Sequence, residues 1–412
     1  MKLISSLALG AVFMTGMVPT VAFAAKEKPA AAPKMTLSKE FRAAAGPAQA
    51  AIKANPAGAD AAVTAAEATA TLPDDKFYAA QFRLAVGSAI KDPAMQQKAV
   101  MAMLGSGSAL ATVDLPRLNF YAGQSAYQAN DFPKAIQYLN EAERLGYKSG
   151  NQDALLLLAE ANFKSNNIPV GLAHVDKAIA ASAAAGVKPP ESWYARASSV
   201  AYKAKLNSES AKWTREQVRA YPTKDNWRSA LVVYRDAATR DGNLNLDIFR
   251  LMRLTKSMAG ERDYYEFASL AFERGLPGEA KSVIDEAIAT AAVPAGSRAL
   301  TELRSMASSK VASDQASLAA SERQAAASAT GRIASATADA YLAYGQDAKA
   351  VTLYQTALTK GGVDVDAVNT RMGIAMLRSG DKVGARTAFV SVKGAARADI
   401  AAFWLLWLDQ QV

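Results

Sequence analysis

The stretch ADAYLAYGQDAKAVTLYQTA, residues 338–357, decides the fold of this 412-residue chain. Its first half has small and aromatic residues at helical spacing and ends at Gly345, because glycine readily adopts the left-handed conformation that closes a helix. Its second half carries an apolar stripe at i, i+4 and i+7, which is typical of a second helix. One such hairpin cannot bury its apolar face alone, so the pattern predicts that neighbouring hairpins stack on it. The small and aromatic positions are Ala338, Tyr341, Ala350, Tyr354 and Ala357.

An internal repeat points to the same architecture. Seven positions between residues 127 and 142 recur with similar residues 36 positions later. A period of about 34 residues is typical of stacked helix-turn-helix repeats, so we expect an all-α chain. The matching pairs are Tyr127 and Phe163, Asn130 and Asn166, Phe132 and Ile168, Pro133 and Pro169, Ala135 and Gly171, Leu139 and Val175, and Ala142 and Ala178.

These residues make the chain resemble the tetratricopeptide repeat (TPR) proteins, here of an exported bacterial type. In that family a small residue and a Tyr precede a turn Gly, and Ala, an aromatic residue and Ala follow. The family's Trp and closing Pro are mostly missing here. The resemblance implies an α-solenoid of stacked TPR-like repeats, with a concave groove lined by the first helix of each repeat. The matching stretches are 338–357, 373–389 with Met376 for the Tyr, 268–287 with Ala271 for the Tyr, and 123–142 with Asn130 for the turn Gly.

Carrying the groove positions of the family over to this chain gives three sets of residues, on three first helices. A peptide or protein segment would lie along them. The groove residues implied by the resemblance are Arg117, Phe120, Gln124, Tyr127 and Gln128; Leu156, Glu160, Phe163 and Lys164; and Arg262, Tyr265, Ser269 and Phe272.

Composition divides the chain into seven segments. The aromatic-free, Ala/Ser-rich stretch before residue 330 is interpreted as a degenerate repeat with a thin core, and a hinge is the alternative. The segments are a signal peptide 1–24, a flexible lead-in 25–36, N-terminal helical hairpins 37–115, a TPR-like solenoid 116–290, the Ala/Ser-rich helical segment 291–330, two clear repeats 331–392, and a C-terminal apolar helix 393–412.

The N-terminus predicts export. Lys2 precedes an apolar run, and Ala22-Phe23-Ala24 fits the small-x-small site at which a secretory signal is cleaved. We therefore expect cleavage after Ala24 and a periplasmic location in a Gram-negative bacterium, with no membrane span after signal removal. The chain has 47 Lys and Arg against 38 Asp and Glu, and losing Lys2 lowers its net charge from +9 to +8. A basic exported protein can meet anionic envelope polymers or acidic proteins, whereas nucleic acid is not an expected partner.

Residues for catalysis are scarce. The chain has no Cys and one His, His174, within a helical pattern, so thiol catalysis and Cys/His or HExxH metal sites are excluded. We expect no catalytic residue, no metal and no cofactor. A lytic-transglycosylase-like enzyme is the least favoured alternative.

One section combines cations with aromatic rings, which suit sugars or anionic polymers. The competing interpretation is that the tryptophans belong to the core beside a solvated basic face. The section contains Lys212, Trp213, Arg215, Arg219, Tyr221, Trp227 and Arg228.

Together these patterns predict a non-catalytic periplasmic solenoid that binds a protein or peptide partner as an adaptor or assembly factor of the cell envelope. The alternative is a module that binds peptidoglycan or another anionic envelope polymer.

The segment from Ile400 to Leu408 is apolar all round and too short to span a bilayer. It either packs into the end of its own solenoid or buries Phe403, Trp404 and Trp407 against another chain, in a dimer for example.

Overall fold

The computed structural model describes residues 35–148, 153–237, 242–294 and 296–411. The predicted signal peptide, 1–24, and nearly all of the lead-in, 25–36, lie outside the described residues. Within these ranges every regular element is a helix, which confirms the predicted all-α class. The chain divides into two compact units, Met1–Pro189 and Pro190–Val412, and the boundary falls inside the stretch 116–290 that we expected to be one segment.

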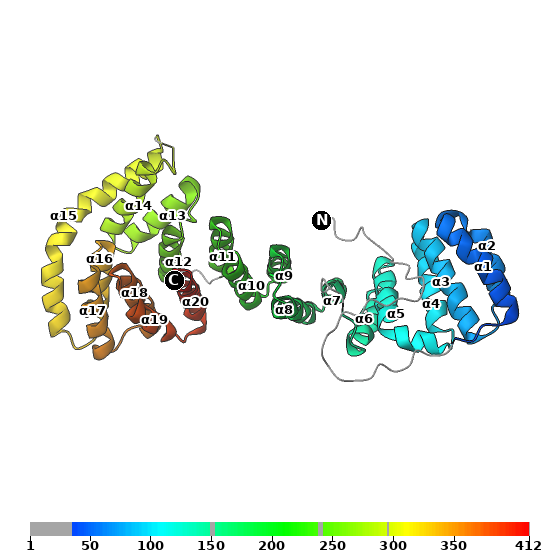
Figure 1. Cartoon of the computed structure of the whole chain (residues 1–412). Coiled ribbons are helices and arrows are strands. Elements are labelled where there is room, and N and C mark those ends of the chain that lie inside the picture. Colours follow the sequence, from blue (N-terminus) through cyan, green and yellow to red (C-terminus); the bar gives the residue numbers. More distant parts are fainter. Residues whose placement is uncertain (1–34, 149–152, 238–241, 295, 412) are drawn as a thin grey trace. The chain divides into compact units, whose positions relative to one another are not determined.

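Unit 1 is a series of helices in which sequence neighbours pack as antiparallel pairs (Figure 1). Its pairs are α1 with α2, α3 with α4, α5 with α6, and α7 with α8. The elements are α1 (Lys39–Ala54), η1 (Pro56–Gly58), α2 (Asp60–Ala68), α3 (Pro73–Ala89), α4 (Pro93–Leu104), α5 (Ala109–Gln128), α6 (Phe132–Arg144), α7 (Asp153–Lys164) and α8 (Ile168–Ala184).

Unit 2 continues the same pattern and ends with a helix that turns back onto the unit (Figure 1). Within the described residues its clearest pairs are α9 with α10, α13 with α14, α16 with α17, and α18 with α19. The elements are α9 (Glu191–Lys203), α10 (Asn207–Ala220), α11 (Lys224–Ala237), α12 (Gly242–Leu254), α13 (Gly260–Glu273), α14 (Pro277–Ala289), α15 (Arg298–Ala327), α16 (Arg332–Ala343), α17 (Asp347–Lys360), α18 (Val365–Arg378), α19 (Lys382–Val390) and α20 (Ala395–Asp409).

The turns between paired helices are made by residues in the left-handed conformation. Gly345 has φ +69° and Gly380 has φ +89°, and Asn130 and Asn166 occupy the same turn position with φ +59° and +60°. Asn tolerates this conformation better than other non-glycine residues do, which explains why it replaces Gly in two repeats. The turn positions of the predicted repeat are therefore confirmed.

The small residues of the repeat lie at the helix crossings. A Cβ added to Gly373 of α18 would lie 2.6 Å from the Phe389 ring of α19, so only glycine allows this approach. In the pair α16/α17, Ala338, Ala350 and Tyr354 are fully buried. The predicted TPR-like solenoid of stacked helix pairs is thus confirmed at the level of side-chain packing.

Replacing Ala350 by Leu is expected to destabilise unit 2 by about 1–3 kcal/mol, because the added atoms overpack a closed helix crossing. Ala348 lies two residues earlier on the same helix and is exposed, so Ala348→Leu is the matched control and should change stability little. Urea unfolding followed by tryptophan fluorescence measures both variants. Equal losses would show that the crossing lies elsewhere.

The Ala/Ser-rich segment 291–330, interpreted above as a degenerate repeat with a thin core, is mostly helical. It forms one 30-residue helix, α15, whose Leu300, Leu303 and Ala307 are buried while most of its surface is exposed. A single long helix needs only a narrow apolar stripe, and this explains the absence of aromatic residues.

The C-terminal apolar helix, α20, packs into its own unit. It contacts α10, α12, α18 and α19, and Phe403 and Trp404 are 0% and 1% exposed. The Trp404 ring stacks on Phe389 at 5.6 Å, and Phe403 lies 6.2 Å from the Trp227 ring. Of the two alternatives for this helix, the structure shows the one in which the helix packs into its own solenoid.

In the part of the chain that the structure describes, no helix is both long and apolar enough to cross a membrane.

Candidate functional site

Two of the three aromatic members of the predicted groove in unit 1, Phe120 and Phe163, are core residues, which corrects the sequence-based assignment. Phe120 stacks on Tyr147 with a centroid distance of 4.6 Å and is 8% exposed. Phe163 is 9% exposed and occupies the space that a side chain at Gly171 would need. These rings fill gaps between paired helices, so they are not available to a ligand.

The polar members of these two sets remain at the surface. Helices α5 and α7 contact each other, and together they present exposed Arg117, Gln128 and Lys164. Arg117 forms an ion pair with Asp114 in the same helix. Among the other members of the two sets, the polar Gln124 and Glu160 are half-buried, and so are Tyr127 and Leu156.

The third predicted set, on α13, lines a surface cavity of about 510 Å³ in unit 2. Arg262, Tyr265 and Ser269 line it together, and Tyr265 is 42% exposed. Phe272 does not line the cavity, because its ring packs against the core. Helices α11 and α12 supply residues that the sequence did not reveal, since α11 and α12 lack a clear repeat pattern. The principal ones are Arg235, Asn245 and Phe249.

Charges of both signs face this cavity. Glu266 accepts a hydrogen bond from Arg262 Nε at 2.7 Å and forms an ion pair with Arg235 Nη1 at 3.3 Å. The Arg235 guanidinium also lies over the Phe249 ring, 5.1 Å from its centroid. The Oδ1 atom of Asn245 is buried and has no hydrogen-bond donor. A buried amide oxygen without a donor is unfavourable, so a ligand that brings an N–H group would stabilise this site.

The basic and aromatic section, residues 212–228, does not present its tryptophan rings at the surface. Trp213 and Trp227 are 0% and 4% exposed, so their faces are covered by the core, as the competing interpretation had it. Arg215 pairs with Asp399 at 3.0 Å, and Arg228 pairs with buried Asp263. Those arginines hold helices together. The remaining members are Lys212, whose Nζ lies over the Trp213 ring, exposed Arg219 and half-buried Tyr221.

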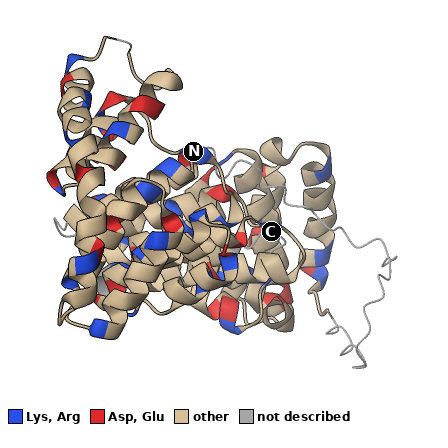
Figure 2. Ribbon diagram, turned by 90° about the vertical axis from the view of Figure 1, so that its left-hand side faces the viewer, with Lys and Arg blue, Asp and Glu red and all other residues tan. Residues whose placement is uncertain are grey.

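A network of ion pairs occupies the interior of unit 2, where helices far apart in sequence meet. Asp247 on α12 contacts Arg250 at 2.9 Å, Arg397 at 2.9 Å and Arg371 at 3.3 Å, and its own carboxylate is fully buried. Burial opposes ionisation of Asp247, but the three guanidiniums outweigh it and hold the pKa of Asp247 below its usual value. Glu279 accepts both hydrogen bonds of a bidentate pair from Arg250. Figure 2 shows basic and acidic residues scattered over the helices.

His174 is a helix residue of unit 1. It is 8% exposed, and burial lowers its pKa, with the Glu143 carboxylate opposing this effect and Lys177 adding to it. The imidazole is therefore neutral at pH 7, and it lies on α8 where the sequence predicted a helix.

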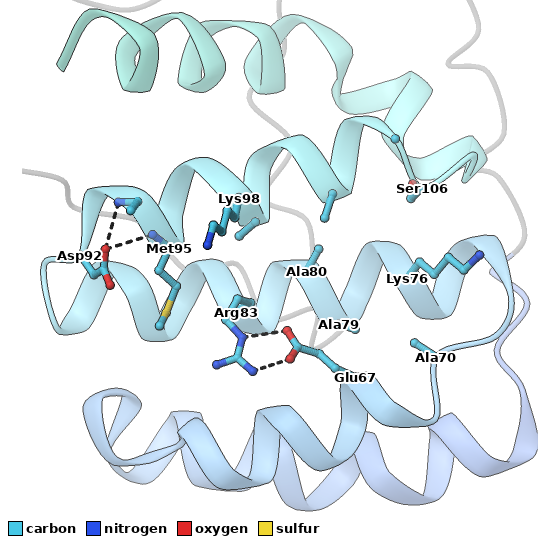
Figure 3. A pocket seen from close by; sticks show the side chains of 14 residues that line it. Glu67, Ala70, Lys76, Ala79, Ala80, Arg83, Asp92, Met95, Lys98 and Ser106 are labelled. Atoms are coloured by element: carbon cyan, nitrogen blue, oxygen red, sulfur yellow. Dashed lines mark hydrogen bonds and ion pairs between the residues drawn. The ribbon is translucent and has the colours of Figure 1, made fainter. Parts of the chain in front are cut away.

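Unit 1 has a surface cavity of its own, of about 620 Å³, between α2, α3 and α4 (Figure 3). Its charged residues are engaged in holding the helices. Arg83 pairs with Glu67 and Asp60, and Asp92 caps α4 by accepting from the backbone N–H of Ala94 and Met95. None of the residues predicted for the groove lines this cavity.

In comparisons with known proteins, this chain is similar only to solved structures, and the similarity is distant. No family model matches the sequence, and no curated protein matches it. Among solved structures, a tetratricopeptide repeat protein from Parabacteroides merdae is 13% identical, over 71% of this chain and 99% of that one, with a TM-score of 0.27. The TPR2AB domain of yeast Sti1 in a pHSP90 complex is 14% identical, over 72% and 96%, with a TM-score of 0.26. The P58(IPK) TPR domain is 11% identical, over 90% and 99%, with a TM-score of 0.22. At these values the TPR-like assignment rests on the helix pairs themselves.

Proposed function

We propose that this chain is a non-catalytic, TPR-like solenoid of the bacterial periplasm that binds a protein or peptide partner as an adaptor or assembly factor. The observation that carries the proposal is the cavity on α13, where three residues expected in a peptide groove lie together at the surface. The periplasmic location rests on the predicted N-terminal export signal alone.

The cavity has what an extended peptide needs. Tyr265 offers a large apolar ring at the surface, and the buried Oδ1 of Asn245 offers an acceptor to a backbone N–H. Acidic and basic side chains both face the space, so neither sign of charge dominates it. Such a surface favours a peptide of mixed composition over a uniformly anionic polymer.

The alternative, an anionic envelope polymer, depended on exposed aromatic rings beside cations. Trp213 and Trp227 are buried, so that surface retains its cations without the stacking faces that sugars use. Only the net positive charge of the chain still favours this alternative.

Photo-crosslinking in intact cells tests the proposal. A benzophenone amino acid at position 265 is expected to yield a discrete adduct that protease digestion removes and muramidase digestion does not. The matched control is the same amino acid in place of Met306, which is 50% exposed on α15 of the same unit and does not line the cavity. Identical adducts at both positions, or muramidase-sensitive ones at 265, would contradict a peptide site on α13.

N-terminal sequencing of the same protein tests export separately. The sequence should begin at Ala25, and an uncleaved chain would refute the export step.

A further inference from the structure

A second cavity of unit 2, of about 770 Å³, has no lining residue in common with the α13 cavity. The turn glycines Gly345 and Gly380 border it, and so does Gln411 just beyond α20. The volume is within the range of small-molecule sites, which are about 300–1,000 Å³. Its lining residues come mostly from α12, α14, α16, α18 and α20, so no single repeat contains it.

One wall of this cavity is apolar. Its accessible part is formed by half-buried Leu377 of α18 and Trp407 of α20, and the buried side chains of Leu342 and Ile374 also line it. Trp407 is partly accessible, so its ring can gain contact area when an apolar group enters. This wall suits an alkyl or similar apolar chain.

The polar part of the lining has an excess of positive charge. Five basic residues and two acidic ones line the cavity, a difference of +3. The two acids are already paired, Glu279 with Arg250 at 2.7 Å and Glu286 with Arg253 at 2.6 Å. The other three cations are Lys256, Arg378 and Lys382.

These three cations have no ion-pair partner within the described residues. Arg378 Nη1 donates to the Leu342 carbonyl at 3.1 Å, and Lys382 Nζ donates to the Gln411 carbonyl at 3.1 Å. Asp347 is near enough to Arg378 to offset part of its charge, although it does not line the cavity. The two lysines are exposed at the rim of the cavity and have no carboxylate in ion-pair contact, so an anionic group could pair with both.

A buried hydrogen-bond donor provides an independent indication. Trp404 lines the cavity and is 1% exposed, and its Nε1–H is buried without an acceptor. A buried N–H group normally has a partner, so an acceptor oxygen brought by a ligand would satisfy it.

From these features we propose that the cavity binds an anionic amphiphile, a single apolar chain that ends in a carboxylate or phosphate group. The apolar chain lies along Leu377 and Trp407, and the head group lies between Lys256 and Lys382. This inference stands on a different cavity from the peptide site and is independent of it.

Calorimetric titration of the protein without its signal peptide tests this inference, with dodecanoate and dodecyl phosphate as probes below their critical micelle concentrations. Both are expected to bind, and their relative affinities distinguish a carboxylate head group from a phosphate. Dodecyl maltoside is neutral and should bind at least about tenfold more weakly, because it loses the charged hydrogen bonds of the head group. Inorganic phosphate keeps the charge but should also bind at least about tenfold more weakly, because it buries no apolar chain. Equal binding of either one overturns the proposal.

Two variants place the binding in this cavity. The double variant Lys256→Glu and Lys382→Glu should weaken dodecanoate binding about tenfold or more. The control is the double variant Lys224→Glu and Lys310→Glu, which changes the net charge equally at exposed lysines of unit 2 outside the cavity and should bind normally. Ala343→Phe places a ring in the cavity and should prevent the alkyl chain of dodecanoate from entering. Circular dichroism of this variant checks that it is folded. Equal affinities in both double variants, or tighter binding of an acidic peptide than of dodecanoate, would refute the amphiphile site.

Discussion

Deleting residues 400–412 is expected to abolish the cooperative unfolding of unit 2 while leaving unit 1 folded and the oligomeric state unchanged. The deletion removes Phe403 and Trp404, two of the largest fully buried side chains of the unit. Truncation of one buried Phe or Trp to Ala costs about 3–5 kcal/mol, and a whole domain is stable by only about 5–15 kcal/mol. Because Phe403 also covers Trp227 and Tyr234, its loss exposes the core around α11.

The measurement can separate the two units. All five tryptophans lie at or beyond residue 193, so tryptophan fluorescence reports on unit 2 alone. Circular dichroism reports on both units, and sedimentation velocity gives the oligomeric state. The single variant Trp404→Ala should lose about 3–5 kcal/mol in the same assay. An unchanged melting temperature together with the loss of a dimer would falsify the view that α20 completes its own unit.

Replacing Asp247 by Asn is expected to destabilise unit 2 by about 3–5 kcal/mol, because the change removes the buried carboxylate that three guanidiniums share and leaves Arg250 paired with Glu279 and Arg371 with Asp339 alone. Arg250, Arg371 and Arg397 all contact this one residue, and each is at most 7% exposed. The control is Glu302→Gln on α15, which breaks the exposed pair with Arg298 and should cost about 0.5 kcal/mol or less. Similar losses in the two variants would show that the network contributes no more than a surface pair.

The same network predicts acid sensitivity. The pKa values of Asp247 and Glu279 are lowered in the folded state, so each binds a proton more readily when unit 2 is unfolded. Their contribution to stability is therefore present in full above the unfolded values of about 4, and it is lost as pH falls through the lower folded values. Unit 2 of the unaltered protein should lose stability below about pH 4. Asp247→Asn should show a shallower decline over that range, because one of the two groups no longer titrates.

The assigned groove shows where reasoning from a repeat pattern succeeds and where it stops. Arg262 and Tyr265, two of the residues that the resemblance implied for a groove, line one surface cavity, because helical spacing places them on one face of α13. Phe120 and Phe163 satisfy the same spacing and are nevertheless buried. Whether an aromatic residue at such a position faces solvent depends on the local gap it can fill, and Gly171 provides that gap for Phe163.

The sequence by itself determined the helix pairs, their turns and their crossings, because these depend on residues within about one repeat of each other. The roles of Gly345, Asn130 and Ala350 follow from their positions in the repeat and from the chemistry of their side chains. Only the tertiary structure decided that α20 contacts α10 and α12, that Asp247 meets three arginines, and that a basic cavity forms beside Trp407. In a solenoid each repeat packs mainly on its neighbours. Contacts between distant repeats depend on the small rotation of each repeat relative to the one before it. These rotations accumulate along the solenoid, and the residues of one repeat do not reveal the accumulated rotation.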